Sequence, residues 1–186
     1  SVPIKYILND FKKLKITKGN LPIFIWQAKE GELWVRFHRR KDAPGLFLVF
    51  AQQLFASGSK VRESSLHTIP GVGVYDWFKI QSNKSPQQLK KMLSVMEEGE
   101  VSIPDVKFDK ISLASEFKDE ATISFRGKDQ KGALLCAAQA ISREGLRIKW
   151  ARGHTWGRKL DDFFCVRRVE NMSAKINSLK NKHERH

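Results

Sequence analysis

A short loop near the middle of the first half of the chain has residue types that suit ligand binding. It reads Asp42-Ala43-Pro44-Gly45-Leu46 and precedes a segment whose apolar residues recur at helical spacing. The first backbone N–H groups of a helix have no partner within the helix, so they attract a carboxylate. Asp42 suits either of two roles, capping the helix or receiving the ammonium group of a ligand. The loop therefore predicts either a ligand site at the helix start or a purely structural turn.

The loop belongs to an internal repeat. Shifting the sequence by 87 positions places Lys41-Asp42 on Lys128-Asp129, and the order of matches is kept across the whole unit. Further pairs are Gly45 and Gly132, Leu48 and Leu135, Ala51-Gln52 and Ala138-Gln139, Gly58 and Gly145, and His67-Thr68 and His154-Thr155. One deleted residue in a later turn then brings Asp76-Trp77-Phe78 onto Asp162-Phe163-Phe164. The chain therefore contains two copies of one unit.

The second loop differs from the first at two positions. It reads Asp129-Gln130-Lys131-Gly132-Ala133, so Asp129 and Gly132 are kept while Lys131 replaces the proline. Gly132 keeps the turn, Asp129 could still pair with a ligand ammonium group, and Lys131 adds a positive charge. We expect an asymmetric pair with one working ligand site, in which Asp129, Lys131 and Gly132 are the weaker counterparts.

Each copy has the pattern β-β-α-β-β-α. Alternating residues predict strands at 33–37 and 121–125, preceded by apolar stretches at 22–26 and 106–113. Helices ending at Gly58 and Gly145 follow, then hairpins that turn at 70–71 and 157–158, and then a second helix in each copy. Ser85-Pro86 predicts the start of the first of these last helices, with Leu89, Met92, Leu93 and Met96 as its buried residues.

This pattern predicts an α+β fold. We expect two tandem ferredoxin-like units, each a four-stranded antiparallel sheet with two helices on one face. The expected boundaries are 20–98 and 105–182, with a linker at 99–104. We expect residues 1–19 to be a basic lead-in and 180–186 a frayed polar tail. The start at a serine suggests a fragment of a longer protein.

The D-x-P-G-L loop at the start of a β-α-β-β-α unit resembles the ACT domain, a family of small-molecule sensors of amino-acid metabolism. The tandem arrangement and the Thr-turn-Asp-aromatic-aromatic hairpins are similar to the C-terminal ACT pair of bacterial PII uridylyltransferase/uridylyl-removing enzymes. Phe108-Asp109 stands where that family has a leading Phe-Asp element. The resemblance covers roughly residues 20–182.

The resemblance implies a regulatory role in nitrogen metabolism. It implies that an amino acid, glutamine in this family, binds where two ACT units meet, within one chain or between chains. The implied site residues are Asp42, Ala43, Pro44, Gly45 and Leu46, with Asp129, Lys131 and Gly132 in the second loop. The implied partners are the catalytic domains of a cytoplasmic parent enzyme and its PII protein. The chain itself contains no P-loop, G-x-S-x-G, H-E-x-x-H, His-Asp or nucleotidyltransferase motif, so we expect neither catalysis nor a cofactor.

Composition leaves two alternatives open. The 34 basic and 20 acidic residues give a net charge of +14, and no apolar run is long enough for a membrane span. A ferredoxin-like sheet with this charge and five tryptophans also suits a single-stranded nucleic-acid-binding module. Because the charge is spread along the chain and no RNA-recognition signature occurs, we do not expect nucleic acid as the partner. A ligand-free dimerisation scaffold is the other alternative.

The histidines and cysteines suggest structural roles. His67 and His154 hold equivalent positions and could face each other between the units, where we expect packing rather than metal binding. Cys136 and Cys165 lie in apolar runs without metal-ligand spacing, so we expect two buried, reduced thiols. Asp161 and Asp162 are adjacent in a predicted strand and should point to opposite faces, which excludes a shared acid–base site.

Overall fold

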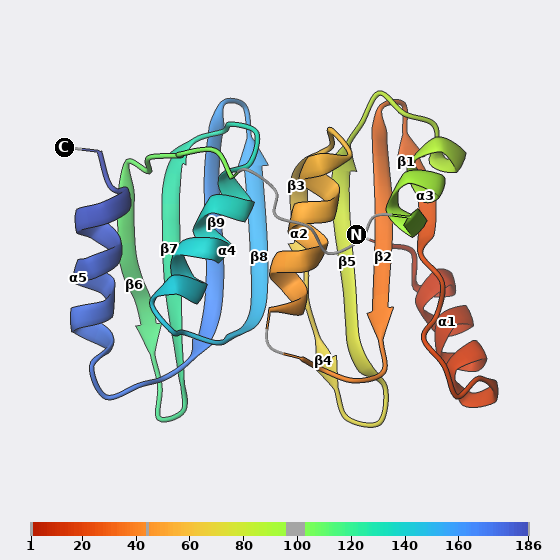
Figure 1. Ribbon diagram of the computed structural model, residues 1–186, viewed down its shortest axis with the longest axis horizontal. Helices are drawn as coiled ribbons and strands as arrows, with labels where there is room; N and C mark the ends of the chain where they lie inside the picture. The colour runs from red at the N-terminus through yellow and green to blue at the C-terminus, as the bar shows by residue number, and fades with distance from the viewer. Residues whose placement is uncertain (1, 44, 96–102, 186) are drawn as a thin grey trace.

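Two antiparallel sheets form the framework of the molecule (Figure 1). The computed structural model describes residues 2–43, 45–95 and 103–185. The first sheet has the strand order β1-β2-β5-β3, with a short β4 also paired to β5. Its strands are β1 (Phe24–Lys29), β2 (Glu32–Arg39), β3 (Lys60–Ser65), β4 (Thr68–Ile69) and β5 (Gly73–Gln81). This is the order of a ferredoxin-like sheet whose last strand has moved to the front of the sequence.

The second sheet repeats the first, in the order β6-β7-β9-β8. Its strands are β6 (Lys110–Glu116), β7 (Glu120–Lys128), β8 (Ile148–Trp156) and β9 (Lys159–Arg167). The registers agree: Phe37 of β2 pairs with Asp76 of β5, and Phe125 of β7 pairs with Asp162 of β9. The expected fold class is therefore confirmed.

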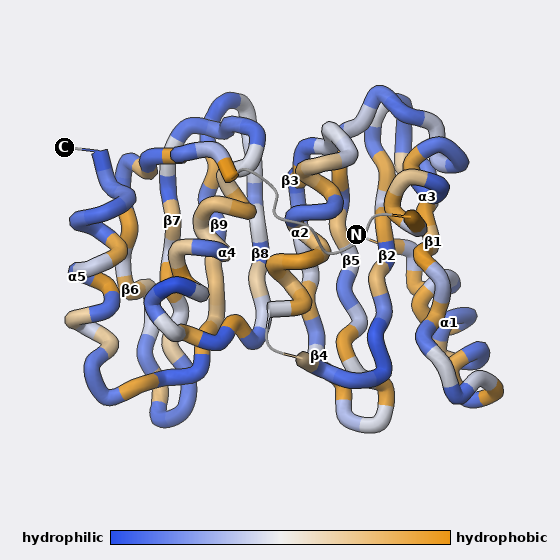
Figure 2. Tube along the Cα trace, viewed as in Figure 1, coloured by the Kyte–Doolittle hydropathy of each residue, from blue (hydrophilic) through white to orange (hydrophobic). Residues whose placement is uncertain are grey.

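Two helices cover one face of each sheet. They are α2 (Leu46–Ala56) and α3 (Pro86–Val95) on the first, and α4 (Ala133–Arg143) and α5 (Met172–His183) on the second. Alternate strand residues such as Val35 and Phe37 face these helices and are fully buried. Hydrophobic residues concentrate on the central strands and on α2 and α4, whereas the hairpin turns are mostly hydrophilic (Figure 2).

The two units share one hydrophobic core. β3 lies beside β8, and α2 packs against α4 in front of them (Figure 1). Phe47 of α2 reaches across the boundary, with its ring centroid 6.2 Å from that of Phe164 in β9. Ala137 and Ala138 of α4 are fully buried, and their small side chains let the two helices approach closely. The two units therefore pair within the chain.

Most of the basic lead-in expected at residues 1–19 forms a helix. α1 (Ile4–Ile16) lies on the face of the first sheet opposite α2, where Tyr6 and Ile7 pack against a cluster of Trp34, Tyr75 and Trp77. The helix has an apolar face at helical spacing, and burying that face gives it a fixed position.

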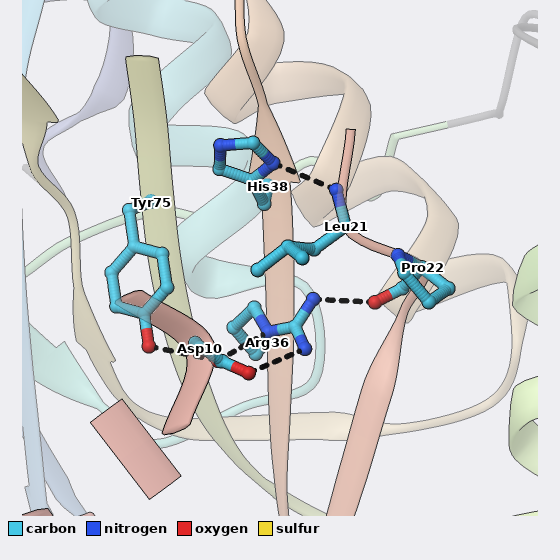
Figure 3. Close-up of polar contacts among 6 residues, drawn as sticks. All are labelled: Asp10, Leu21, Pro22, Arg36, His38 and Tyr75. Carbon is cyan, nitrogen blue, oxygen red and sulfur yellow. Dashed lines mark hydrogen bonds and ion pairs between the residues drawn. The ribbon is translucent and has the colours of Figure 1, made fainter. Parts of the chain in front are cut away.

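A buried ion pair holds α1 to the sheet (Figure 3). Arg36 of β2 donates from Nε to Asp10 Oδ2 at 2.8 Å and from Nη2 to Asp10 Oδ1 at 3.1 Å. Its third donor, Nη1, bonds the carbonyl of Pro22, and Tyr75 Oη donates to Asp10 at 2.9 Å. Both charged side chains are at most 5% exposed, and together these bonds satisfy them.

The polar tail is also ordered as far as Arg185, which corrects the expectation of a frayed end. Phe108 donates its N–H to His183 O, and its carbonyl accepts from the N–H of Arg185, each at 2.8 Å. Arg185 also pairs with Asp109 at 2.9 Å. Tertiary hydrogen bonds thus fix a segment that looks free from composition alone.

Most local expectations are confirmed. Gly58 and Gly145 have positive φ after their helices, and Ser85 and Gln88 cap α3 through reciprocal hydrogen bonds. The leading strands begin later than expected, at Phe24 and Lys110. Leu89 and Leu93 of α3 are buried and Met92 is half-buried. Met96 and most of the expected linker at 99–104 lie outside the described residues; the boundaries 20–98 and 105–182 stay a prediction.

The Asp10–Arg36 pair gives a stability prediction. We expect Asp10→Ala to lower the free energy of unfolding by about 3–5 kcal/mol, because it leaves the buried Arg36 guanidinium without a counterion. Asp109→Ala removes a pair that is exposed and should cost less than about 1 kcal/mol. Urea denaturation measures both. Equal effects of the two variants would contradict the anchoring role, as would failure of the double variant Asp10→Leu/Arg36→Met to recover stability.

Candidate functional site

The predicted loop of the first unit lines a cavity between the units. This cavity has a volume of about 380 Å³, within the range of small-molecule sites. Asp42, Ala43, Gly45 and Leu46 line it from the first unit, and residues 145–149 line it from the end of α4 to the start of β8. We call it the interface cavity. Pro44 lies outside the described residues.

The start of α2 leaves its first amides available. Gly45 adopts φ +85°, which only glycine tolerates readily, and no side chain caps the helix. The carboxylate of Asp42 is directed elsewhere: it accepts from Thr68 Oγ1 at 3.4 Å and from Arg147 Nη2 at 2.8 Å. Asp42 therefore does not act as the cap. The Leu46 N–H donates to Ala43 O at 3.3 Å, and the amides that follow it in the first turn suit a carboxylate.

A second carboxyl group, Asp76, lies in the same cavity. It projects from β5 on the helix-facing side, is 2% exposed, and accepts a 3.1 Å hydrogen bond from the N–H of His67. Burial raises the pKa of Asp76 to about 8; the His67 N–H opposes this shift, and the carboxylate of Asp42 adds to it. A cation that enters the cavity can therefore ionise Asp76 and pair with it.

The charges in the cavity suit a zwitterion. Arg147 and the start of α2 favour a negative group, whereas Asp42 and Asp76 favour a positive one. Asp42 and Arg147 belong to different units, so a ligand between them contacts both. The arrangement matches the two charged groups that every free amino acid carries.

The second loop faces a cavity that is nearly filled. Its volume is about 30 Å³, enough for little more than water. Lys60 Nζ and Arg62 Nη1 each lie 2.6 Å from Asp129 Oδ2, so two cations from the first unit already occupy the carboxylate. A Cβ at Gly132 would lie 2.4 Å from Pro104 Cγ. Asp129, the expected partner of a ligand ammonium group, is therefore already paired within the protein.

Lys131 does not point to a ligand position either. Its Nζ lies 5.3 Å from the ring centroid of Phe55, over the aromatic face. Asp129 and Gly132 line the small cavity with Phe55, at the opposite end of the β3–β8 contact from Asp42. The structure therefore places the two loops in separate cavities of very different volume.

One substitution between the repeats contributes to the different ion pairing of the two loop aspartates. In the first unit Lys79 binds Glu32 at 3.3 Å, so Arg62 is left to reach Asp129. The position equivalent to Lys79 is Cys165, which is neutral, and Glu120 therefore pairs with Lys149 instead. Lys149 is the counterpart of Arg62 but pairs with Glu120, so Arg147 is the one cation that forms an ion pair with Asp42 among the described residues.

Other candidate groups do not form a site of their own. His67 and His154 line one cavity near the β3–β8 contact, and burial lowers the pKa of His67. Cys136 and Cys165 are buried and free. Within residues 2–43, 45–95 and 103–185, no group of three or more His, Cys, Asp or Glu could hold a metal ion. No helix in this part of the chain is both long and apolar enough to cross a membrane.

Sequence reasoning missed Asp76 and Arg147 as site residues. Asp76 could have been found, because an aspartate that shares the core-facing side of a strand with Val74 and Phe78 needs a special reason to be there. Arg147 gave no signal, since its contact with Asp42 spans 105 positions and depends on how the units pair.

Comparison with known proteins supports the fold. Comparison with family models and with curated protein sequences gives no match. Among solved structures, aspartate kinase from Synechocystis matches 82% of this chain with a TM-score of 0.51 and 14% identity, and the match covers 26% of the kinase chain. A protein of unknown function from Galdieria sulphuraria matches 81% of this chain and 88% of its own, also at 14% identity, with a TM-score of 0.30 that is too low to support an argument. The chain therefore has two tandem ferredoxin-like units and spans about a quarter of the kinase it matches.

The buried carboxyl groups predict a pH dependence of stability. Burial raises the pKa of Asp162 to about 7, with Asp161 and Asp129 adding to the shift, and that of Asp76 to about 8. At these two groups the folded state binds more protons than the unfolded state, so their contribution to the free energy of unfolding should fall as the pH rises from about 4 to about 8. His38, His67 and His183, whose pKa values burial lowers, act in the opposite direction. Asp76→Asn should make this fall shallower, because the amide oxygen still accepts from His67 but does not titrate.

Urea denaturation at a series of pH values tests this prediction. Glu30→Gln, which removes an exposed carboxyl group that does not line the interface cavity, is the control and should keep the slope of the unmodified chain. The account of Asp76 is wrong if Asp76→Asn and Glu30→Gln give the same pH profile.

Proposed function

We propose that this chain is a tandem ACT regulatory region that binds one amino acid per chain, in the interface cavity. The observation that carries the proposal is the charge arrangement: Arg147 and the free start of α2 on one side, Asp42 and Asp76 on the other. The ligand carboxylate would bind the α2 amides and Arg147, and its ammonium group would bind Asp42 and Asp76.

We further propose glutamine as the amino acid and a cytoplasmic PII uridylyltransferase/uridylyl-removing enzyme as the parent. This choice rests on the resemblance of the D-x-P-G-L loop and of the tandem arrangement to that family. Bound ligand would contact both units and so favour one arrangement of the pair, and the catalytic domains and PII would respond to that arrangement.

The two alternatives are weaker. Trp26, Trp34 and Trp77, three of the tryptophans that suggest nucleic-acid binding, pack under α1 and are unavailable for stacking on bases. A ligand-free scaffold would need no cavity of about 380 Å³ lined by charged groups from both units. The open interface cavity therefore favours a binding role.

Isothermal titration with glutamine tests the site. We expect Asp42→Ala to weaken binding roughly ten-fold or more, because a charge-assisted hydrogen bond contributes about 1.5–3 kcal/mol, with little change in the thermal midpoint. Asp129→Ala is the matched control: it alters the equivalent loop and should leave affinity unchanged.

Two outcomes would overturn the proposal. If neither glutamine nor any of the other standard amino acids binds at millimolar concentration to the folded chain, the sensing role is wrong. If Asp42→Ala and Asp129→Ala weaken binding equally, the binding site is not the interface cavity. Tight binding of another amino acid, lost in Asp42→Ala, would keep the site and replace glutamine.

A further inference from the structure

A second, larger cavity lies between one end of the second sheet and the first unit. Its volume is about 710 Å³, and it forms where the turn between β6 and β7, the start of β8 and the end of β9 meet residues 66–70 of the first unit. Backbone hydrogen bonds of 3.0 Å fix these segments, from Arg167 N–H to Arg147 O and from Arg168 N–H to Asp119 O. We call this cavity the basic cleft. It is rich in cations: Lys118, Arg147, Lys149, Arg167 and Arg168 line it, against the carboxylates Asp42 and Asp119.

Two of the five cations have no counterion. Arg147 pairs with Asp42, Lys149 with Glu120, and Arg168 with Glu116 at 2.6 Å. In the described part of the chain, the side chains of Lys118 and Arg167 make no ion pair and no hydrogen bond. Both side chains are exposed, so their charges are available to a ligand.

The equivalent corner of the first unit is different. There Lys79 lies between Glu32 and Glu63, at 3.3 and 3.2 Å, in a group that is neutralised within the protein. By strand register, Glu63 corresponds to Trp150 of the second unit and Gln81 corresponds to Arg167. The second unit thus has an aromatic ring and a guanidinium in place of a carboxylate and an amide.

We propose that the basic cleft binds a nucleotide. Its phosphates would bind Arg167 and Lys118, since guanidinium and ammonium groups are the usual partners of phosphate. Its base would stack on Trp150, the half-buried aromatic side chain in the lining, because every base offers an aromatic face to such a ring. The volume lies within the range of small-molecule sites.

The cleft and the interface cavity share the Asp42–Arg147 pair. A phosphate beside Arg147 would compete with the carboxylate of the amino acid for the guanidinium. Nucleotide and amino acid would then weaken each other's binding by the same factor. This coupling rests on the proposed function, whereas nucleotide binding itself does not.

Titration of the full chain with ADP, pyrophosphate and adenosine at 150 mM salt tests the proposal, read by calorimetry and by tryptophan fluorescence. We expect ADP to bind more tightly than pyrophosphate, and adenosine to bind much more weakly than ADP. The double variant Lys118→Gln/Arg167→Gln should weaken ADP binding ten-fold or more. Trp150→Leu should reduce ADP affinity to that of pyrophosphate and leave pyrophosphate binding unchanged.

The control is Lys128→Gln/Arg158→Gln, which removes the same two charges from exposed positions outside the cleft lining. It should change ADP affinity less than two-fold, and circular dichroism should show all variants folded. Equal losses in the two double variants would mean that only diffuse charge attracts ADP, and would overturn the site. Absence of ADP binding at millimolar concentration would overturn it too, and equal affinity for ADP and pyrophosphate would overturn the nucleotide assignment.

Failure of this proposal is distinguishable from failure of the amino-acid site. Lys118 and Arg167 do not line the interface cavity, so their variants leave glutamine binding measurable without nucleotide. ADP binding without an effect on glutamine affinity would contradict only the coupling.

Discussion

The packing of β3 beside β8 and of α2 against α4 is the constraint on which the other features of the molecule depend. This packing joins the two duplicated units through one hydrophobic core, so separating them would expose part of that core to solvent. It also places the start of α2 in the first unit near the end of α4 in the second. Both cavities at the boundary follow from that placement, since each combines a loop from one repeat with a strand start from the other.

Duplication alone would give two equal sites, and the observed asymmetry has an electrostatic cause. Each cavity has one aspartate from a loop and two cations from the opposite unit in reach. In the first unit Lys79 satisfies Glu32, so Lys60 and Arg62 both remain for Asp129. In the second unit Cys165 carries no charge and donates only a weak hydrogen bond to Glu120, with which Lys149 forms an ion pair. This neutral side chain in a central strand thus changes how many cations pair with each loop aspartate, and Pro104 packed against Gly132 further fills the smaller cavity.

Much of the fold could be predicted from the sequence because it depends on local periodicity. Alternation in 33–37 and the helix-terminating Gly58 are local signals that the second copy repeats, and Ser85-Pro86 is a further local signal in the first copy. The position of α1 could not be predicted in this way, because its anchor is the bond between Asp10 and Arg36, which are 26 positions apart. The sequence pattern pointed to the loop residues. It did not point to Arg147, which pairs with Asp42 across the unit boundary, or to Lys60 and Arg62, which pair with Asp129 across it. Their roles follow from tertiary packing, which no spacing in the sequence encodes.

The number and location of amino-acid sites test the account most directly. Calorimetry with glutamine gives the stoichiometry of the full chain, and amide chemical shifts of Gly45 and Gly132 report the two helix starts separately. The account predicts one glutamine per chain, a large shift change at Gly45, and none at Gly132. Two equivalent sites, or a change at Gly132 with none at Gly45, would contradict it.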